Sequence, residues 1–206
     1  MKGFSTKAIH SASIKKDVHG ALRMPLYENV AFEFECARDI QLSFEGRSLG
    51  HSYTRMSNPT VEDLEQRVRL LSEARGVVAL SSGMAAITNI VLTLAEAGTN
   101  IISTRYLFGN TYSLFEHTLK PWGLTVNYID MAKAENLASA INEKTRAVFL
   151  ETITNPQLQV VDIAKLSEIA AAAGIPVILD GTVTTPYLFR SKDFGVAVEV
   201  LSSTKY

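Results

Sequence analysis

The sequence contains few residues that could form a disulfide or bind a metal ion. Cys36 is the only cysteine among 206 residues, so no disulfide can form within the chain and a reducing compartment is expected. The four histidines, at positions 10, 19, 51 and 117, lack the spacing of metal ligands, and we predict no metal site. The nucleophile elbow, the Walker loop and the dinucleotide-binding glycine pattern are also missing from the sequence.

An excess of one charge and long apolar runs are missing as well. The net charge of −1 gives no reason to expect nucleic acid or an anionic membrane as a partner. No apolar run approaches the roughly 20 residues that span a bilayer, and the sequence does not start with an apolar signal segment. Because 47% of the residues are hydrophobic, a sizeable core can form, and we expect a soluble cytoplasmic protein.

The pattern divides the chain into an arm and an α/β domain. Residues 1–58 show little sustained periodicity, which is typical of an extended arm or a functional loop. Residues 59–206 begin with a helix that Asn58 or Thr60 can cap. Short continuous apolar strands and helices then alternate, which predicts a mostly parallel sheet covered on both faces. Strands are expected at 77–81, 100–104, 124–129, 146–151, 176–180 and 196–201, and helices at 84–97, 111–119, 132–141 and 162–174.

Lys205 follows the last expected strand, directly after small hydroxyl residues. A lysine amine that faces a pocket and is partly desolvated loses its proton more easily and can form a Schiff base with a carbonyl. If that carbonyl is the aldehyde of pyridoxal 5′-phosphate (PLP), Ser202 and Thr204 are placed to hydrogen-bond the phosphate. A solvated lysine after a strand is the alternative interpretation.

Two polar side chains follow other expected strands. Asp180 closes an apolar strand, where a buried carboxylate would need a partner such as the pyridinium nitrogen of PLP. Asn155, after the strand at 146–151, can donate a hydrogen bond to the ring oxygen of the cofactor. Each is also explained as a turn residue, because Asp180 precedes a glycine and Asn155 precedes a proline.

Three further stretches fit a planar, phosphorylated ligand. Ser82-Gly83-Met84 joins a strand to a helix, where small residues let backbone N–H groups approach an anion; an ordinary tight turn is the alternative. Phe108 can stack on a planar ring or be a core aromatic. In the arm, Arg55 near Tyr53 suits a phosphate by its bidentate geometry, or is a surface arginine.

The order of these stretches resembles the Cys/Met-metabolism family of PLP-dependent enzymes of fold type I. That family includes cystathionine γ-synthase, the cystathionine lyases, methionine γ-lyase and O-acetylhomoserine sulfhydrylase. The resemblance runs from about residue 20 to the end of the chain. It is carried by Tyr53-Thr54-Arg55, Asn58-Pro59-Thr60, Ser82-Gly83-Met84, Gly109-Asn110-Thr111, Glu151-Thr152, Asn155-Pro156, Asp180 with Thr182, and Ser202-Ser203-Thr204-Lys205-Tyr206.

The resemblance implies a role in cofactor binding or catalysis for these residues. Lys205 would form the Schiff base, Asp180 would pair with the pyridinium, and Asn155 would touch the ring oxygen. Tyr53 and Arg55 would reach the phosphate of a neighbouring subunit, so that the active unit is a homodimer, usually paired into a tetramer, and residues 1–58 pack on the partner. Lys205 and Tyr53 are the expected catalytic residues. The other expected cofactor contacts are Ser82, Gly83, Met84, Phe108, Thr182, Ser202 and Thr204.

The sequence also departs from the family. Phe108 stands where the family has a ring-stacking tyrosine that is implicated in protonating the leaving group. A phenylalanine cannot donate a proton, so this role is empty or falls to another group such as Tyr112 or Tyr53. Gly181 replaces the usual asparagine, and Leu201 replaces the usual histidine.

Together these features predict γ-replacement on an O-acylhomoserine, which makes homocysteine or methionine precursors. The spelling at residues 53–60 and 64–68 looks most like the O-acetylhomoserine sulfhydrylase branch, and Asn110 stands where methionine γ-lyases typically carry cysteine. Cystathionine γ-synthase, a cystathionine γ- or β-lyase and a non-catalytic fragment of the PLP fold are the alternatives. Family members are about twice as long, so we expect residues 59–206 to be an incomplete PLP-binding large domain without the C-terminal domain that binds the substrate carboxylate.

Overall fold

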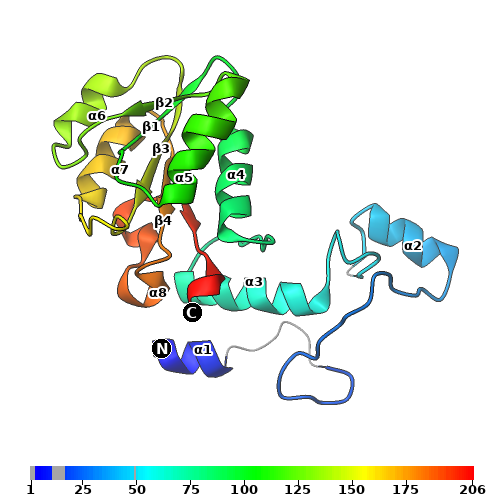
Figure 1. The fold of residues 1–206 in the computed structure, drawn as a ribbon. Helices are drawn as coiled ribbons and strands as arrows, with labels where there is room; N and C mark the ends of the chain where they lie inside the picture. The colour runs from blue at the N-terminus through cyan, green and yellow to red at the C-terminus, as the bar shows by residue number, and fades with distance from the viewer. Residues whose placement is uncertain (1–2, 11–16, 49) are drawn as a thin grey trace. The chain divides into compact units, whose positions relative to one another are not determined.

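The computed structural model describes residues 3–10, 17–48 and 50–206, which form two compact units, Met1–Ala79 and Leu80–Tyr206. Figure 1 shows the elements of both units. Within the described residues, no helix is long and apolar enough to cross a membrane.

The first unit contains the helices α1 (Phe4–His10), α2 (Ala37–Phe44) and α3 (Pro59–Ser72). The start of α3 is as predicted, since the side-chain oxygen of Asn58 accepts a hydrogen bond from the backbone N–H of Thr60 at 2.9 Å. The expectation of little regular structure before residue 59 is wrong for α1 and α2. These helices have only seven and eight residues, so each is too short for the repeated apolar spacing over several turns that reveals a helix in a sequence.

The arm predicted at residues 1–58 is fastened to the start of α3. The Asn58 side-chain amide donates to the carbonyl of Tyr27 at 2.9 Å, and the Thr60 hydroxyl donates to the carbonyl of Pro25 at 2.8 Å. Positions 1–2, 11–16 and 49 of the predicted arm lie outside the described residues. The contribution of this arm to a neighbouring subunit stays a prediction.

The second unit contains one parallel sheet, and this confirms the predicted fold class. Its strand order is β2-β1-β3-β4-β5, and every neighbouring pair is parallel. The strands are β1 (Asn100–Ser103), β2 (Thr125–Tyr128), β3 (Thr145–Glu151), β4 (Val177–Asp180) and β5 (Val198–Val200). The helices are α4 (Gly83–Leu94), α5 (Gly109–Ser113), α6 (Glu135–Ala140), α7 (Ile163–Ala172) and α8 (Thr185–Leu188), and a π-helical stretch, Leu114–Leu119, continues α5.

The strand expected at 77–81 does not form, so that prediction is wrong. Val78 and Leu80 are exposed, and the backbone N–H of Ala79 donates to the side chain of Glu65 at 2.7 Å instead of to a neighbouring strand. The apolar composition of this segment suits a strand, but composition alone does not supply the partner strand that its backbone would need.

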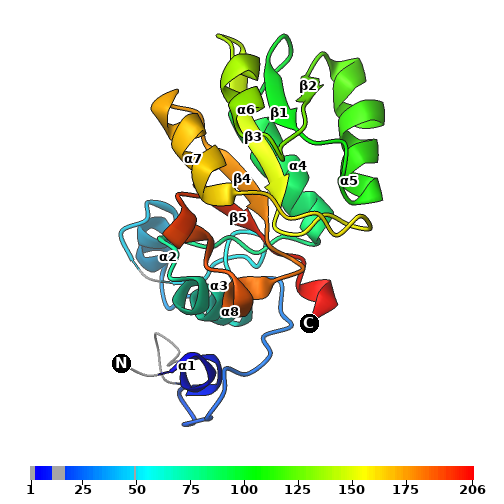
Figure 2. The same ribbon diagram turned by 90° about the vertical axis from the view of Figure 1, so that its left-hand side faces the viewer.

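Helices cover both faces of the sheet, and the strand residues alternate between two cores. Figures 1 and 2 show α4 and α5 on one face and α6 and α7 on the other. Phe149 and Ile178 pack in the first core with α4, whereas the adjacent Leu150 and Leu179 pack in the second with α6 and α7.

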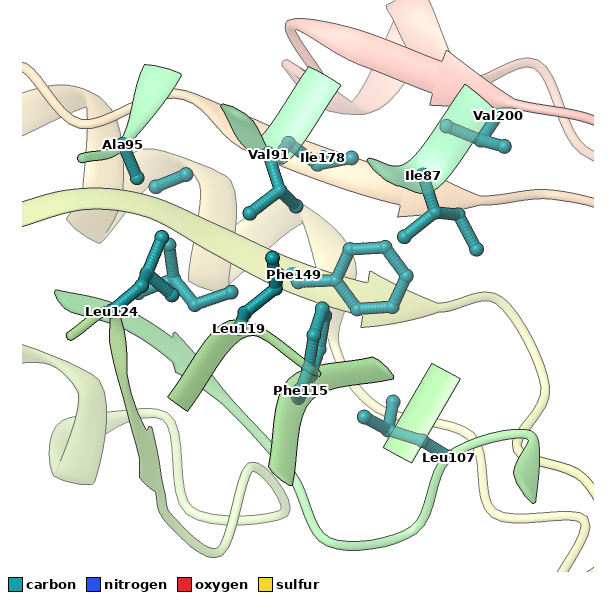
Figure 3. Close-up of a cluster of buried hydrophobic side chains, with 12 residues drawn as sticks. Ile87, Val91, Ala95, Leu107, Phe115, Leu119, Leu124, Phe149, Ile178 and Val200 are labelled. Atoms are coloured by element: carbon teal, nitrogen blue, oxygen red, sulfur yellow. The ribbon is translucent and has the colours of Figure 1, made fainter. Parts of the chain in front are cut away.

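The first core is centred on Phe149. Figure 3 shows its ring beside that of Phe115, and the two centroids are 5.3 Å apart with the planes at 90°. Both side chains are fully buried. The central strands β3 and β4 are apolar along most of their length, and each ends in an acidic residue, Glu151 and Asp180.

Candidate active site

Two acidic residues end neighbouring strands at the carboxyl edge of the sheet. Glu151 is the last residue of β3 and Asp180 the last residue of β4, and the two are register partners. Ligands bind beyond this edge in parallel α/β sheets. The structure therefore places two carboxylates side by side where the sequence predicted a site.

Asp180 suits a cationic ring nitrogen. Burial raises the pKa of its carboxyl above the ordinary value, although hydrogen bonds from Thr182 oppose that shift. The backbone N–H of Thr182 donates to Asp180 Oδ1 at 2.9 Å. A buried carboxylate whose charged form is disfavoured gains from a cationic donor, and the pyridinium nitrogen of PLP is one.

Thr182 also connects Asp180 to the turn after β5. Its hydroxyl oxygen accepts a hydrogen bond from the backbone N–H of Ser202 at 2.9 Å. Two of the predicted cofactor residues, Thr182 and Ser202, are thus held together beside a third, Asp180.

Ser202 in turn lies against the N-terminus of α4. A Cβ atom added at Gly83 would lie 2.7 Å from the Cβ of Ser202, which is closer than two such atoms can approach. The Ser82 hydroxyl accepts from the backbone N–H of Ala85 at 3.1 Å and caps the helix. The first N–H groups of this 12-residue helix lie beside Ser202, an arrangement in which a helix N-terminus could accept an anion such as a phosphate; the phosphate contact itself stays a prediction.

Lys205 and Thr204 lie in a short 3₁₀ turn, Ser203–Lys205, beyond the end of β5. The backbone N–H of Lys205 donates to the carbonyl of Ser202 at 3.1 Å, so the turn follows directly from the residue that contacts α4. The side chain of Lys205 is exposed, and the partial desolvation that we expected for it is not found among the described residues.

Glu151 connects the two remaining predicted contacts, Phe108 and Asn155. Its Oε1 accepts a hydrogen bond from the backbone N–H of Phe108 at 2.6 Å, and its Oε2 accepts one from the backbone N–H of Asn155 at 3.2 Å. The ring of Phe108 is 37% exposed, and Asn155 is exposed, so both side chains are available to a ligand.

The environment of Glu151 perturbs its ionisation strongly. Burial is the largest cause and, with the negative charge of Asp180, it raises the pKa of Glu151 from 4.5 to about 7; the two backbone N–H donors oppose this shift. Sequence reasoning noted Glu151 only as part of a motif. Its position at the end of an apolar strand, like that of Asp180, was the signal that could have identified it.

Tyr53 and Arg55 belong to the first unit, whereas the other predicted site residues belong to the second. The guanidinium carbon of Arg55 lies 5.0 Å from the centroid of the Tyr53 ring, a cation–π distance, and both side chains are exposed. Their contact with a cofactor phosphate stays a prediction.

Gly181, one of the departures from the family pattern, has a structural reason. A Cβ atom at this position would overlap Glu199 Oε1 and would lie 3.3 Å from a methyl carbon of Leu201. The glycine therefore leaves room for Glu199 and Leu201, and the two departures from the family pattern, at positions 181 and 201, lie next to each other in the structure. Glu199 was not identified from the sequence.

Two cavities beside this sheet are lined by residues other than the predicted site residues. One, of about 750 Å³, is lined mainly by residues 104–106, 128–130 and 159–161. A smaller one, of about 270 Å³, is lined by Thr152, Ile153, residues 160–164, Thr184, Leu188, Phe189 and Phe194. Within the part of the chain that the structure describes, no group of three or more His, Cys, Asp and Glu side chains is arranged to hold a metal ion.

We predict that Glu151 makes the stability of the chain depend on pH. Because its pKa rises from 4.5 to about 7 on folding, the folded chain binds more protons than the unfolded chain between these values. The free energy of unfolding should then fall as the pH rises from about 4.5 to about 7, by on the order of 3 kcal/mol from this group. Urea unfolding across this range should show a shallower pH dependence for Glu151→Gln than for the unchanged chain, and equal slopes would contradict the assignment.

Comparison with known proteins identifies the family. Residues 5–206 match the family described as Cys/Met metabolism PLP-dependent enzymes. L-methionine gamma-lyase of Fusobacterium nucleatum is 37% identical over 205 residues, which are 99% of this chain and 52% of that protein. The structure of O-acetylhomoserine sulfhydrylase of Wolinella succinogenes is 52% identical, with a TM-score of 0.68, and covers 70% of this chain and 42% of its own.

A Campylobacter jejuni structure that contains a pyridoxyl-lysine 5′-monophosphate has a TM-score of 0.92 at 33% identity, covering 98% of this chain and 50% of its own. The chain spans about half the length of the curated relatives that it matches. The family match confirms the resemblance seen in the sequence, and with it the predicted cofactor. The chain belongs to the Cys/Met-metabolism family of PLP-dependent enzymes.

Proposed function

We propose that the protein carrying this chain uses PLP to replace the acyl group of an O-acylhomoserine with a sulfur nucleophile. Phe108 carries this proposal. It lies at the carboxyl edge of the sheet, next to Glu151, and its side chain has no proton to donate. The reaction that suits such a site is one whose leaving group departs without being protonated.

The leaving groups of the competing reactions differ in whether they need to be protonated as they depart. An acyl ester releases a carboxylate, whereas methionine and cystathionine release a thiolate, and a carboxylic acid has a pKa roughly 4 units below that of a thiol. A carboxylate therefore leaves readily without an acid, while a thiolate needs one. Tyr112, a candidate to replace the missing phenol, packs against the first core with its ring 5.8 Å from that of Tyr128, so its ring is engaged in that core.

The relatives include both branches. Over 99% of the chain, an O-acetyl-L-homoserine sulfhydrylase is 38% identical and a methionine gamma-lyase is 41% identical, and the Wolinella succinogenes O-acetylhomoserine sulfhydrylase is 52% identical over 70% of the chain. Several methionine gamma-lyases also match almost the whole chain, so elimination from methionine is the second candidate. It is less well supported because it needs the acid that Phe108 cannot supply.

In the second unit, some residues would bind the cofactor and Lys205 would also transfer protons. When bound, PLP withdraws electrons from the carbon atoms of an amino acid that is attached to it. Asp180 would accept a hydrogen bond from the ring nitrogen, and the N-terminus of α4 with Ser202 would hold the phosphate. The Nζ atom of Lys205 would hold the cofactor before the substrate arrives, and would then take a proton from the α-carbon and return it.

A homodimer would complete the site. The exposed pair of Tyr53 and Arg55 offers a phenol and a guanidinium on one surface of the first unit, a combination that suits the phosphate of a cofactor in a neighbouring subunit. This arrangement would explain why residues 17–58 bury almost no side chain within their own unit.

The direct test is the product spectrum of the protein at its natural length. With sulfide as donor, O-acetylhomoserine should give homocysteine, and Lys205→Ala should abolish this activity, because no other group is expected to move the α-proton. Methionine should be cleaved much more slowly than O-acetylhomoserine is converted. Cleavage of methionine at the faster rate would support the second candidate, and no reaction with either substrate would support a non-catalytic member of the family.

Phe108→Tyr should add the missing acid. General acid catalysis contributes on the order of 10²–10⁴ in rate, so we expect cleavage of methionine or cystathionine to rise by at least about tenfold, while conversion of O-acetylhomoserine changes little. Steady-state kinetics with both substrate types would measure the change. Phe44→Tyr, on an exposed helix of the first unit, is the matched control. Equal effects on both substrate types would show that position 108 does not select the leaving group.

Gly83→Ala should weaken PLP binding, because the added methyl group would collide with the Cβ of Ser202 and separate α4 from the turn after β5. Loss of one or two phosphate hydrogen bonds to a charged group predicts a rise in the dissociation constant of PLP of about tenfold or more. Absorbance titration of the cofactor-free protein measures it. Gly76→Ala, where a Cβ meets nothing within 4 Å, is the control, and unchanged PLP affinity in Gly83→Ala would contradict the phosphate site.

A further inference from the structure

Glu151 connects two loops through its carboxylate, which distinguishes it from its neighbour Asp180. Both are acidic residues at the ends of adjacent strands, but the carboxylate of Glu151 binds two loops at once. One oxygen accepts the backbone N–H of Phe108 in the loop after β1, and the other accepts the backbone N–H of Asn155 in the loop after β3. Glu151 is only 6% exposed, so these bonds are shielded from water.

We propose that Glu151 is a positioning residue, which fixes the Phe108 and Asn155 loops relative to each other and so sets how the Phe108 ring and the Asn155 amide meet the cofactor. This inference rests on the proposed function for the identity of the ligand. Glu151 is not proposed to react, because each of its oxygens already accepts a backbone hydrogen bond.

The backbone that carries Glu151 is held in the sheet. Glu151 pairs in register with Asp180, and the backbone N–H of the next residue, Thr152, donates to the Asp180 carbonyl at 3.0 Å. A side chain at the end of such a strand can serve as a fixed point for both loops.

The Asn155 loop keeps its own shape without Glu151. The backbone N–H of Leu158 donates to the carbonyl of Thr154 at 2.9 Å, and the backbone N–H of Gln159 donates to the Thr154 hydroxyl at 2.9 Å. The hydrogen bond to Glu151 therefore contributes to where this turn lies relative to Phe108, not to whether the turn forms.

The test compares two buried acids. Glu151→Gln keeps the shape but turns an NH₂ group toward one of the two backbone N–H groups, so that at least one hydrogen bond is lost. Glu199→Gln is the matched control: Glu199 lies on β5, its Oε1 is buried and has no hydrogen-bond partner among the described residues, and the charge of Asp180 raises its pKa, as it does for Glu151. Both variants remove a carboxylate near Asp180, but only the first releases the loops.

The first measurement is amide hydrogen exchange of the natural-length protein without cofactor. Loss of a buried hydrogen bond should speed exchange by about tenfold at residues 105–112 and 153–159 in Glu151→Gln, beyond any uniform change in the strands that follows from a change in the stability of the domain, with no such local change at these residues in Glu199→Gln. Unchanged exchange of either loop relative to the strands would overturn the proposal. An equal change in the loops and in the whole sheet would overturn it as well, because Glu151 would then act only on the stability of the domain.

The second measurement is binding of PLP to the same proteins. We expect Glu151→Gln to bind PLP about tenfold more weakly and to reduce the visible circular dichroism of the bound cofactor, which reports the orientation of its ring; Glu199→Gln should do neither. Faster loop exchange with unchanged affinity and dichroism would refute a positioning effect on the cofactor. If the unchanged protein binds no PLP, the proposed function fails and this inference fails with it, whereas the exchange result on the two loops stands independently.

Discussion

The candidate site depends on two carboxylates that are buried side by side at the ends of β3 and β4. Asp180 and Glu151 are neighbours in register, and burial disfavours the charge of each. Water solvates such groups poorly at this depth, so other donors must compensate them. Thr182 does so in part for Asp180, and the backbone of two loops does so for Glu151. A cationic partner would stabilise the Asp180 carboxylate further, and the protonated ring nitrogen of the family's cofactor could be that partner.

The parallel sheet places the two carboxylates next to each other, because neighbouring parallel strands end at the same edge. Alternate strand residues fill two apolar cores, and the central strands β3 and β4 each end in a carboxylate. The N-terminus of α4 lies at the same edge, so the proposed phosphate site and the proposed partner of the ring nitrogen are connected by contacts from Gly83 through Ser202 and Thr182 to Asp180. A ligand with a phosphate at one end and a protonated ring nitrogen at the other matches both ends of this path.

The sequence was informative wherever a local signal has one structural outcome. Apolar runs between helix patterns predicted six strands, five of which form the parallel sheet, and the ends of two of these identified Asp180 and Ser202. The Ser82-Gly83-Met84 turn was identified by its small residues at the start of α4, although the strand expected before it does not form. Prediction from the sequence failed where the structure of a segment depends on contacts with residues that are distant along the chain. The run at 77–81 has strand composition but no neighbouring strand to pair with among the described residues, and Val78 is exposed. The bridging by Glu151 and the fit of Glu199 beside Gly181 are contacts between separate segments, which no local pattern contains.

The central claim is that this edge holds PLP through Lys205, and the most direct test is the intact mass of the natural-length protein before and after borohydride reduction. The account predicts that the reduced protein gains the mass of one pyridoxyl phosphate group per chain and that peptide mapping places it on Lys205. A mass that does not change on reduction, or a group found on another lysine, would contradict the account.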